Sequence, residues 1–302
     1  MFNKTNLTNE TPPEFKHGIL PFNPGNATVC LLAVLLNGVE MVIIIRKKKI
    51  LNFERTLLSL CVADMLVSLL YLCQAFYQLV HDESMYGHFA RDLVQFPLEI
   101  FAVMSSVTNI IVLGVDRLLA VKYPLKHAGW MTSRTINTLI AAAWVGGIAL
   151  SVISYANRFA APADNSDAAW FTAMYIFSGL LFSSGFAIII IYGIIVFTVT
   201  RRAAKMRQMR HSESQSRGDE FAVTITCILV VVAFTICSYP YAVARLISRR
   251  PILKFKTILL NPLLDPLVYF FKGLLQRKLK KKGPNPSLSL STITNKTNDD
   301  KK

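Results

Sequence analysis

Two aspartates, Asp64 and Asp265, lie inside long apolar stretches of the chain, where an ionisable side chain is unusual. In the interior of a lipid bilayer a carboxyl group is costly unless it meets a partner, so each of the two is a candidate functional group. Two carboxylates brought together would repel unless one carries a proton or a cation lies between them. Oxygen ligands suit a hard cation such as sodium. An aspartate pair could also act as the acid and the base of a hydrolase.

Glu99 and Arg117 are eighteen residues apart in a third apolar stretch. Eighteen residues make five helical turns, so the two side chains face the same way and lie about 27 Å apart. Glu99 then points into a helix bundle near the mouth opposite Arg117. There it could contact a cationic ligand, pair with an internal cation such as Arg245, or stay protonated. Gln95 and Tyr241 are its candidate neighbours.

Asp116-Arg117 ends one apolar stretch, and Glu220 begins another. A salt bridge between Arg117 and Glu220 would tie the two stretches together at one end and could open as a switch. Pro240 interrupts the stretch that Glu220 begins. It removes a backbone hydrogen bond and predicts a kink about which half of that helix could swing.

These groups must be positioned by elements that cross a membrane. With 53% hydrophobic and 17% charged residues, the chain is too apolar for a water-soluble domain. Seven apolar segments are each long enough to cross a hydrocarbon core of roughly 30 Å as a helix and too long for barrel strands. They are 27–45, 54–80, 92–121, 135–156, 169–200, 220–247 and 253–271. The predicted fold is an all-α membrane protein, a seven-transmembrane helix bundle.

The net charge of +15 sets the expected orientation. Clustered basic residues can bind nucleic acid, but here they gather in the first, third and fifth connections, as the positive-inside rule requires of cytoplasmic loops. The sixth connection is an exception, and its basic residues are interpreted as an outer rim. The amino terminus is then outside, where Asn3, Asn6 and Asn9 are predicted glycosylation acceptors. We expect a multi-pass protein of the plasma membrane with a cytoplasmic carboxyl terminus.

Four regions are expected along the chain. Residues 1–26 form an extracellular tail, and 27–271 form the seven-span domain. Residues 272–282 alternate apolar and basic side chains, as in an amphipathic helix lying on the anionic inner leaflet. Residues 283–302 have the composition of a disordered tail.

Polar and aromatic residues follow a fixed order along the seven segments. They are Asn37, Asp64 in Leu60–Asp64, Asp116-Arg117-Leu118, Trp144, Tyr192, Phe234-x-x-Cys237-x-x-Pro240 and Asp265-Pro266-x-x-Tyr269. Each motif is weak alone. In this order, on seven spans, the set resembles the rhodopsin-like (class A) G-protein-coupled receptors along nearly the whole chain between the two tails.

The resemblance implies a receptor that catalyses nothing and binds an extracellular ligand, a cationic amine or a peptide, through Glu99, Gln95 and Tyr241. It implies activation of a heterotrimeric G protein at the cytoplasmic face by outward movement of the sixth span. The switch and coupling residues would be Asp116, Arg117, Glu220, Tyr192, Tyr269, Phe234, Pro240 and Pro266. The resemblance implies no cofactor other than an allosteric sodium ion at Asp64, Ser106, Asn261 and Asp265.

Several positions depart from the family's pattern. Asp92 stands where the family has the third-span Cys of an extracellular disulfide, Ser184 replaces the fifth-span Pro, and Ser238 replaces the sixth-span Trp. The missing disulfide and fifth-span Pro are similar to melanocortin-type receptors. An opsin is disfavoured, because Leu259 stands where opsins carry the retinal-binding lysine.

Two other classes of protein could use paired intramembrane aspartates. A small transporter or channel is the main alternative, although the odd number of spans and the absence of an internal repeat count against it. An intramembrane protease is the second. It is disfavoured because the Gly-x-Gly-Asp loop signature of such enzymes is missing.

Overall fold

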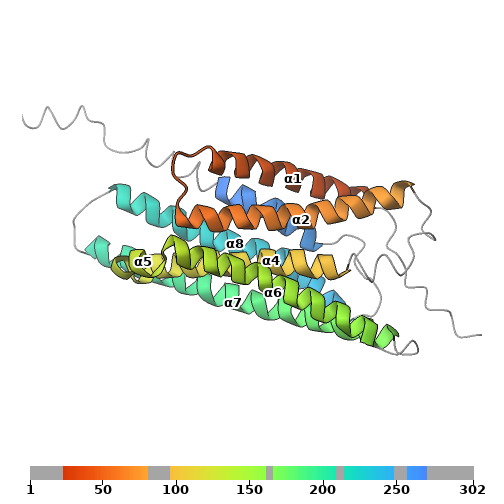
Figure 1. Cartoon of the computed structure of the whole chain (residues 1–302). Helices are drawn as coiled ribbons and strands as arrows, with labels where there is room; N and C mark the ends of the chain where they lie inside the picture. Colours follow the sequence, from red (N-terminus) through yellow and green to blue (C-terminus); the bar gives the residue numbers. More distant parts are fainter. Residues whose placement is uncertain (1–22, 81–95, 161–165, 209–213, 248–256, 271–302) are drawn as a thin grey trace, which may run out of the picture.

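A computed structural model describes residues 23–80, 96–160, 166–208, 214–247 and 257–270, which are helical apart from short turns (Figure 1). The helices are α1 (Pro24–Ile45), α2 (Asn52–Val80), α4 (Phe96–Lys122), α5 (Pro124–Trp130), α6 (Ser133–Ala160), α7 (Ser166–Gln208) and α8 (Ser214–Ile247). A 3-10 turn, η3 (Thr257–Leu260), leads into a last α-helix over 261–270.

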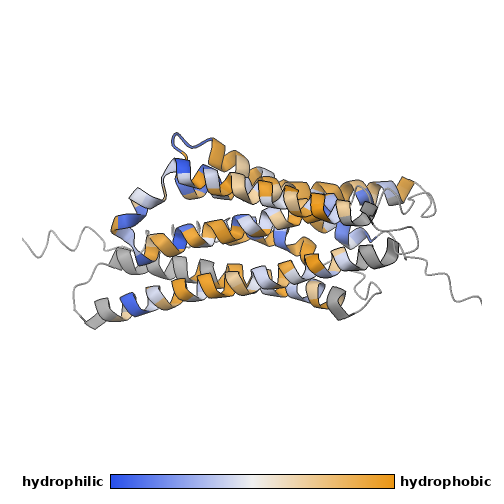
Figure 2. Cartoon of the chain, turned by 60° about the horizontal axis from the view of Figure 1, so that its bottom comes forward, coloured by the Kyte–Doolittle hydropathy of each residue, from blue (hydrophilic) through white to orange (hydrophobic). Residues whose placement is uncertain are grey.

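Seven apolar helices of the described chain correspond to the seven predicted segments. Five are long and apolar enough to cross a membrane, namely Pro24–Ile45, Asn52–Tyr77, Phe96–Lys122, Ser133–Ala156 and Thr172–Arg202. Two shorter apolar helices, Ile228–Ala244 and Thr257–Phe270, complete the set. Hydrophobic residues dominate the middle of the bundle, and hydrophilic residues gather at its left end (Figure 2). The predicted all-α bundle is confirmed.

Helix α4 is the centre of the bundle. It packs against α2, α6 and α7, whereas α1 packs mainly on α2, and α8 packs on α7 and η3 (Figure 1). Within its most apolar window 72% of the residues of α4 are buried, against 17% for α6. The apolar outer faces of α1 and α6 are therefore left for lipid, since a bilayer solvates such surfaces.

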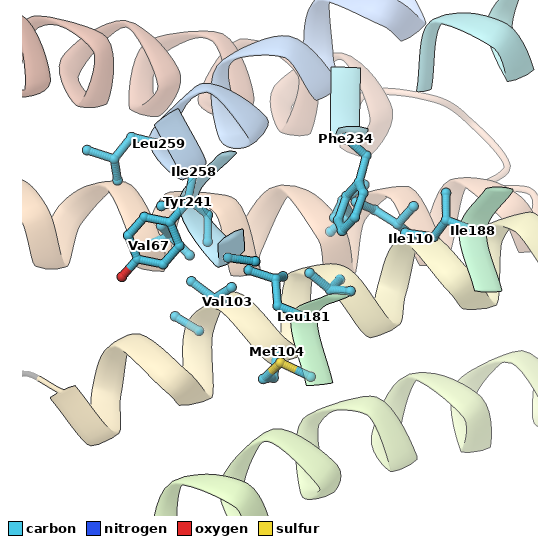
Figure 3. Close-up of a cluster of buried hydrophobic side chains, with 14 of the residues drawn as sticks. Val67, Val103, Met104, Ile110, Leu181, Ile188, Phe234, Tyr241, Ile258 and Leu259 are labelled. Atoms are coloured by element: carbon cyan, nitrogen blue, oxygen red, sulfur yellow. The ribbon is translucent and has the colours of Figure 1, made fainter. Parts of the chain in front are cut away.

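The buried core joins side chains from several elements of the bundle (Figure 3). It contains Val67 of α2, Val103, Met104 and Ile110 of α4, Leu181 and Ile188 of α7, Phe234 and Tyr241 of α8, and Ile258 and Leu259 of η3. In lipid these contacts stabilise the bundle through close packing, because lipid tails are as apolar as the helix faces. Glycines permit that packing. A Cβ on Gly147 of α6 would lie 3.0 Å from the Phe101 carbonyl oxygen of α4 and even closer to Ser105 Oγ.

Two of the differences between the helices and the predicted segments have a local cause. Helix α1 begins at Pro24, three residues before the expected 27, because Asn23 Oδ1 accepts a hydrogen bond of 2.9 Å from Gly25 N and Pro24 occupies the first turn. Helix α5 was not expected at all. Its seven residues are too few for a periodic pattern to be read, although Pro124 at its start is a typical first-turn residue.

Candidate functional site

The two intramembrane aspartates meet in the middle of the bundle. Asp64 of α2 is fully buried, and Ser106 of α4 donates a hydrogen bond of 2.6 Å from Oγ to its Oδ1. The carboxyl group of Asp265, on the last helix, lies in hydrogen-bonding contact with that of Asp64. The structure therefore brings together three of the four residues predicted to hold sodium.

The aspartate pair has unused binding capacity. The Oδ2 atoms of Asp64 and Asp265 are both buried and have no hydrogen-bond partner among the described residues. Two buried carboxyl groups in contact require a shared proton or a cation. Within the described ranges no three His, Cys, Asp or Glu side chains are arranged to hold a metal ion. A cation here would therefore need the Ser106 hydroxyl and other neutral oxygens as ligands.

Asn261, the fourth predicted sodium ligand, makes a different contact. Its Nδ2 donates a hydrogen bond of 2.7 Å to Ser238 Oγ of α8. Ser238 stands where the family has a tryptophan, and its small hydroxyl side chain leaves both the room and the acceptor for this bond. The structure thus couples the last helix to α8 through Asn261 and Ser238.

Asn37 of α1 stabilises the last helix through a main-chain carbonyl. Its Nδ2 donates bonds of 2.6 Å to the Pro262 oxygen and 2.9 Å to the Ala33 oxygen. The Pro262 oxygen would normally accept from the N–H four residues later, but residue 266 is a proline and has none. Asn37 supplies the missing donor.

Glu40 is a third acidic residue near the aspartates, and the sequence analysis missed it. It is half-buried on α1, its carboxyl group is in hydrogen-bonding contact with the Cys61 thiol, and its charge acts on Asp64 and Asp265. Its Oε2 has no partner in the described part of the chain. The signal that identified Asp64, an acidic residue inside an apolar segment, applies equally to Glu40.

The α5 end of the bundle holds the Asp116-Arg117 pair. The Arg117 guanidinium lies 3.2 Å from Asp116 Oδ2 and stacks on the Phe53 ring at 4.2 Å from its centroid. His127 Nε2 lies 2.9 Å from the other carboxylate oxygen of Asp116. His127 was not predicted, because its place beneath Asp116 depends on α5. The side chain of Glu220 lies outside the described residues, so the predicted Arg117–Glu220 bridge stays a prediction.

The other predicted switch residues surround α4 and α8. Tyr192 of α7 is buried and donates a hydrogen bond of 3.4 Å to the Ile110 oxygen of α4. Its ring packs closely on Gly114 of α4, because a Cβ added to that glycine would lie only 2.9 Å from the ring. Phe234 is buried in the core (Figure 3). Pro240 lies inside the continuous helix α8. Pro266 and Tyr269 both lie in the helix over 261–270.

Glu99 and Tyr241 meet at the opposite end of the bundle, as predicted. The Tyr241 hydroxyl donates a hydrogen bond of 3.1 Å to Glu99 Oε1, and both residues are buried. Phe96, three residues before Glu99, packs edge to face against Phe177 of α7, with ring centroids 6.4 Å apart. Gln95 and the Arg245 side chain lie outside the described residues, as do Asp92 and the predicted glycosylation acceptors Asn3, Asn6 and Asn9.

Residues 36–269 match the family model described as 7 transmembrane receptor (rhodopsin family). The chain is 28% identical over 156 residues to somatostatin receptor type 3 of Homo sapiens. This alignment covers 48% of this chain and 36% of that receptor. The chain is also 26% identical over 163 residues to probable G-protein coupled receptor No18 of Amphibalanus amphitrite. That alignment covers 49% of this chain and 42% of the other protein. Both alignments thus span less than half of the relative.

A longer alignment to somatostatin receptor type 2 of Sus scrofa is 25% identical over 298 residues and covers 88% of this chain and 78% of that receptor. The family model itself covers well over half of the 302 residues, from the first span to Tyr269. This chain therefore belongs to the rhodopsin family of seven-transmembrane receptors.

Proposed function

We propose that this chain is a G-protein-coupled receptor of the plasma membrane, with the α5 end in the cytoplasm and the Glu99 end open to an extracellular ligand. The four basic residues Arg46, Lys47, Lys48 and Lys49 of the α1–α2 connection lie at the same end as α5 (Figure 1). Basic connections favour the cytoplasmic side, which supports this orientation. Membership of the receptor family supports coupling to a heterotrimeric G protein.

The environment of Arg117 carries the proposal. One ion pair with Asp116 and one aromatic ring, that of Phe53, hold its guanidinium at the α5 end. A guanidinium held in this way can be transferred to oxygen acceptors of a docking protein without breaking a larger network. Outward movement of α8 about Pro240 would expose Arg117, and Tyr192 and Tyr269 would rearrange in the space that α8 leaves.

The ligand is proposed to be a peptide that presents a basic side chain to Glu99. The Glu99 carboxyl group has one described hydrogen bond, from Tyr241, and no Lys or Arg among the described side chains pairs with it. A buried carboxylate of this kind gains most from a cationic partner. A small amine would satisfy the same carboxylate, but several relatives are named as somatostatin receptors, which favours a peptide.

A sodium ion is proposed as an allosteric ligand between Asp64 and Asp265. The Ser106 hydroxyl and the two unpartnered Oδ2 atoms support it. Sodium would stabilise the inactive arrangement by holding α2, α4 and the last helix together. No observation favours a transporter or a protease over this reading.

The test is basal signalling in cells. The receptor is expressed with sensors that report dissociation of each class of G protein, next to Arg117→Ala and Glu220→Ala at matched surface levels. Arg117→Ala should abolish the basal signal, because the group that the G protein binds is gone, and Glu220→Ala should raise it by releasing Arg117. Lys48→Ala, a charge loss in the α1–α2 connection, is the control and should change little. A signal that survives Arg117→Ala unchanged would contradict the proposed coupling.

A further inference from the structure

The end of α4 and helix α5 together carry a stripe of basic and aromatic side chains, which we call the α5 flank: Lys122 of α4, Tyr123 between the two helices, and Lys126 and Trp130 of α5. The Lys122 Nζ lies 5.5 Å from the centroid of the Tyr123 ring, and the Lys126 Nζ lies 5.7 Å from that of Trp130. The two rings pack edge to face, with centroids 5.7 Å apart. All four side chains are exposed.

The α5 flank is separate from the two other faces of α5. The inner face carries His127, which contacts Asp116. Leu125 is two residues earlier, about 200° around the helix, and is 96% exposed. Lys126 and Trp130 are four residues apart and are therefore neighbours on the helix surface. The contact between the Tyr123 and Trp130 rings adds Tyr123 to the same stripe.

The charge of the α5 flank is not compensated within the described chain. Arg202 of α7 donates a hydrogen bond of 3.4 Å to the Lys122 carbonyl oxygen, which brings a third cation to the same corner. No described carboxylate pairs with Lys122, Lys126 or Arg202. Asp116, on the same corner of the bundle, is buried and already contacts Arg117 and His127.

Exposed Tyr and Trp rings at the end of a membrane-spanning helix are typical of the level of the lipid headgroups. Tyr123, between the end of α4 and the start of α5, is 41% exposed, and Trp130, the last residue of α5, is 49% exposed. Lysines at this level can lay their aliphatic stems along apolar surface and place their ammonium groups among headgroup phosphates. Anionic lipids of the cytoplasmic leaflet attract such groups.

We infer that the α5 flank binds the phosphate headgroup of an anionic phospholipid, with the ammonium groups of Lys122 and Lys126 contacting the phosphate and the rings of Tyr123 and Trp130 lying beside the upper acyl chain. The choice of the cytoplasmic leaflet rests on the orientation proposed above; the binding itself does not. A lipid held here would fix α5, and with it His127, beneath Asp116.

The test uses the fluorescence of Trp130 in the full chain, reconstituted in phosphatidylcholine nanodiscs. A minor fraction of lipid with brominated acyl chains is added, either as phosphatidylserine or as phosphatidylcholine, and the quenching due to Trp130 is taken as the difference from Trp130→Phe. Brominated phosphatidylserine should quench Trp130 at a clearly lower mole fraction than brominated phosphatidylcholine. Equal quenching by the two lipids would overturn the inference.

Charge variants show where the preference arises. Lys122→Gln with Lys126→Gln should lower the apparent affinity for phosphatidylserine by about fivefold for each lysine. The matched double variant Lys48→Gln with Lys49→Gln removes the same charge from exposed residues at the same end and should keep the preference. Equal losses in both would show a general charge effect and sink the site. Lys122→Arg with Lys126→Arg should restore binding, which separates lost contacts from misfolding.

A soluble competitor distinguishes the lipid from a free phosphate. Glycerophosphoserine, which has the headgroup without the acyl chains, should leave the quenching by brominated phosphatidylserine almost unchanged. If it displaces the lipid at comparable concentration, the α5 flank recognises soluble phosphates and the lipid assignment is wrong. None of these readouts needs an agonist or a G protein, so failure here leaves the receptor function untouched.

Discussion

The carboxyl group of Glu99 accepts a hydrogen bond from the Tyr241 hydroxyl in a buried setting, so a change of its charge can be separated from a change of its shape. Glu99→Gln keeps an oxygen for Tyr241 but removes the charge. For a Lys-containing peptide agonist selected on the parent receptor, we expect potency to fall by roughly 10- to 100-fold, as for the loss of a charged hydrogen bond. The measurement is the concentration dependence of G-protein activation.

The same peptide with its lysine acetylated is the control ligand. It should activate the parent receptor and Glu99→Gln with similar potency, because the acetylated lysine is neutral and forms no ion pair with either side chain. Tyr241→Phe should weaken both peptides alike. If Glu99→Gln lowers the potency of the two peptides equally, Glu99 supports the structure of the pocket and does not read the cation.

Residues inside the spans were predictable where one rule sufficed. The cost of a charge in lipid identified Asp64 and Asp265, helical spacing from Arg117 identified Glu99, and the first rule applied to the first span would have identified Glu40. His127 was out of reach, because its contact with Asp116 depends on how a seven-residue helix turns. The contact between Asn261 and Ser238 depends on the room left by an absent indole, which a pattern of residue types does not describe.

At the scale of elements, the α4–α6 contact depends on the absence of a side chain. Gly147→Ala would place a methyl group 3.0 Å from the Phe101 carbonyl oxygen and still closer to Ser105 Oγ. We expect overpacking to cost about 1–3 kcal/mol and to lower the melting temperature of the purified receptor. Gly146→Ala is the matched control, because nothing lies within 4 Å of its added Cβ. Equal melting temperatures for the two variants would mean that α4 and α6 can move apart to fit the methyl group without loss of stability.

The helices themselves followed from hydropathy. Seven apolar segments became seven apolar helices, since each must satisfy its backbone hydrogen bonds inside the bilayer. The ends were less predictable. The first helix starts at Asn23 and Pro24 because of a side-chain cap, and the fifth apolar helix continues to Gln208, well past the predicted 200, through a basic stretch that hydropathy excludes.

For the whole molecule, sodium should act as a stabilising ligand. A cation between Asp64 and Asp265 would link three helices, so the receptor should melt at a higher temperature in sodium chloride than in the chloride of a larger cation, by about 1 kcal/mol of stability at several times the dissociation constant. Asp64→Asn should remove the difference. Thermal unfolding of the purified receptor in the two salts is the measurement.

Glu40→Gln is the matched variant for this experiment. It also removes one acidic group near the pair, but no third acidic side chain of the described chain completes a metal site with the two aspartates. The sodium dependence should therefore persist in Glu40→Gln. If the sodium dependence were lost in Glu40→Gln and retained in Asp64→Asn, the cation would be placed at α1 instead.

Helix α4 runs without a break from Phe96 to Lys122, with Glu99 near one end and Asp116 and Arg117 near the other. An α-helix resists twisting about its own axis, so an angular displacement imposed at Glu99 reaches Arg117, five turns away on the same face, almost undiminished. Because α2, α6 and α7 all pack against α4, each must accommodate that rotation. We therefore expect this single continuous helix to transmit a rotation between the two ends of the bundle, in addition to any relay through side chains.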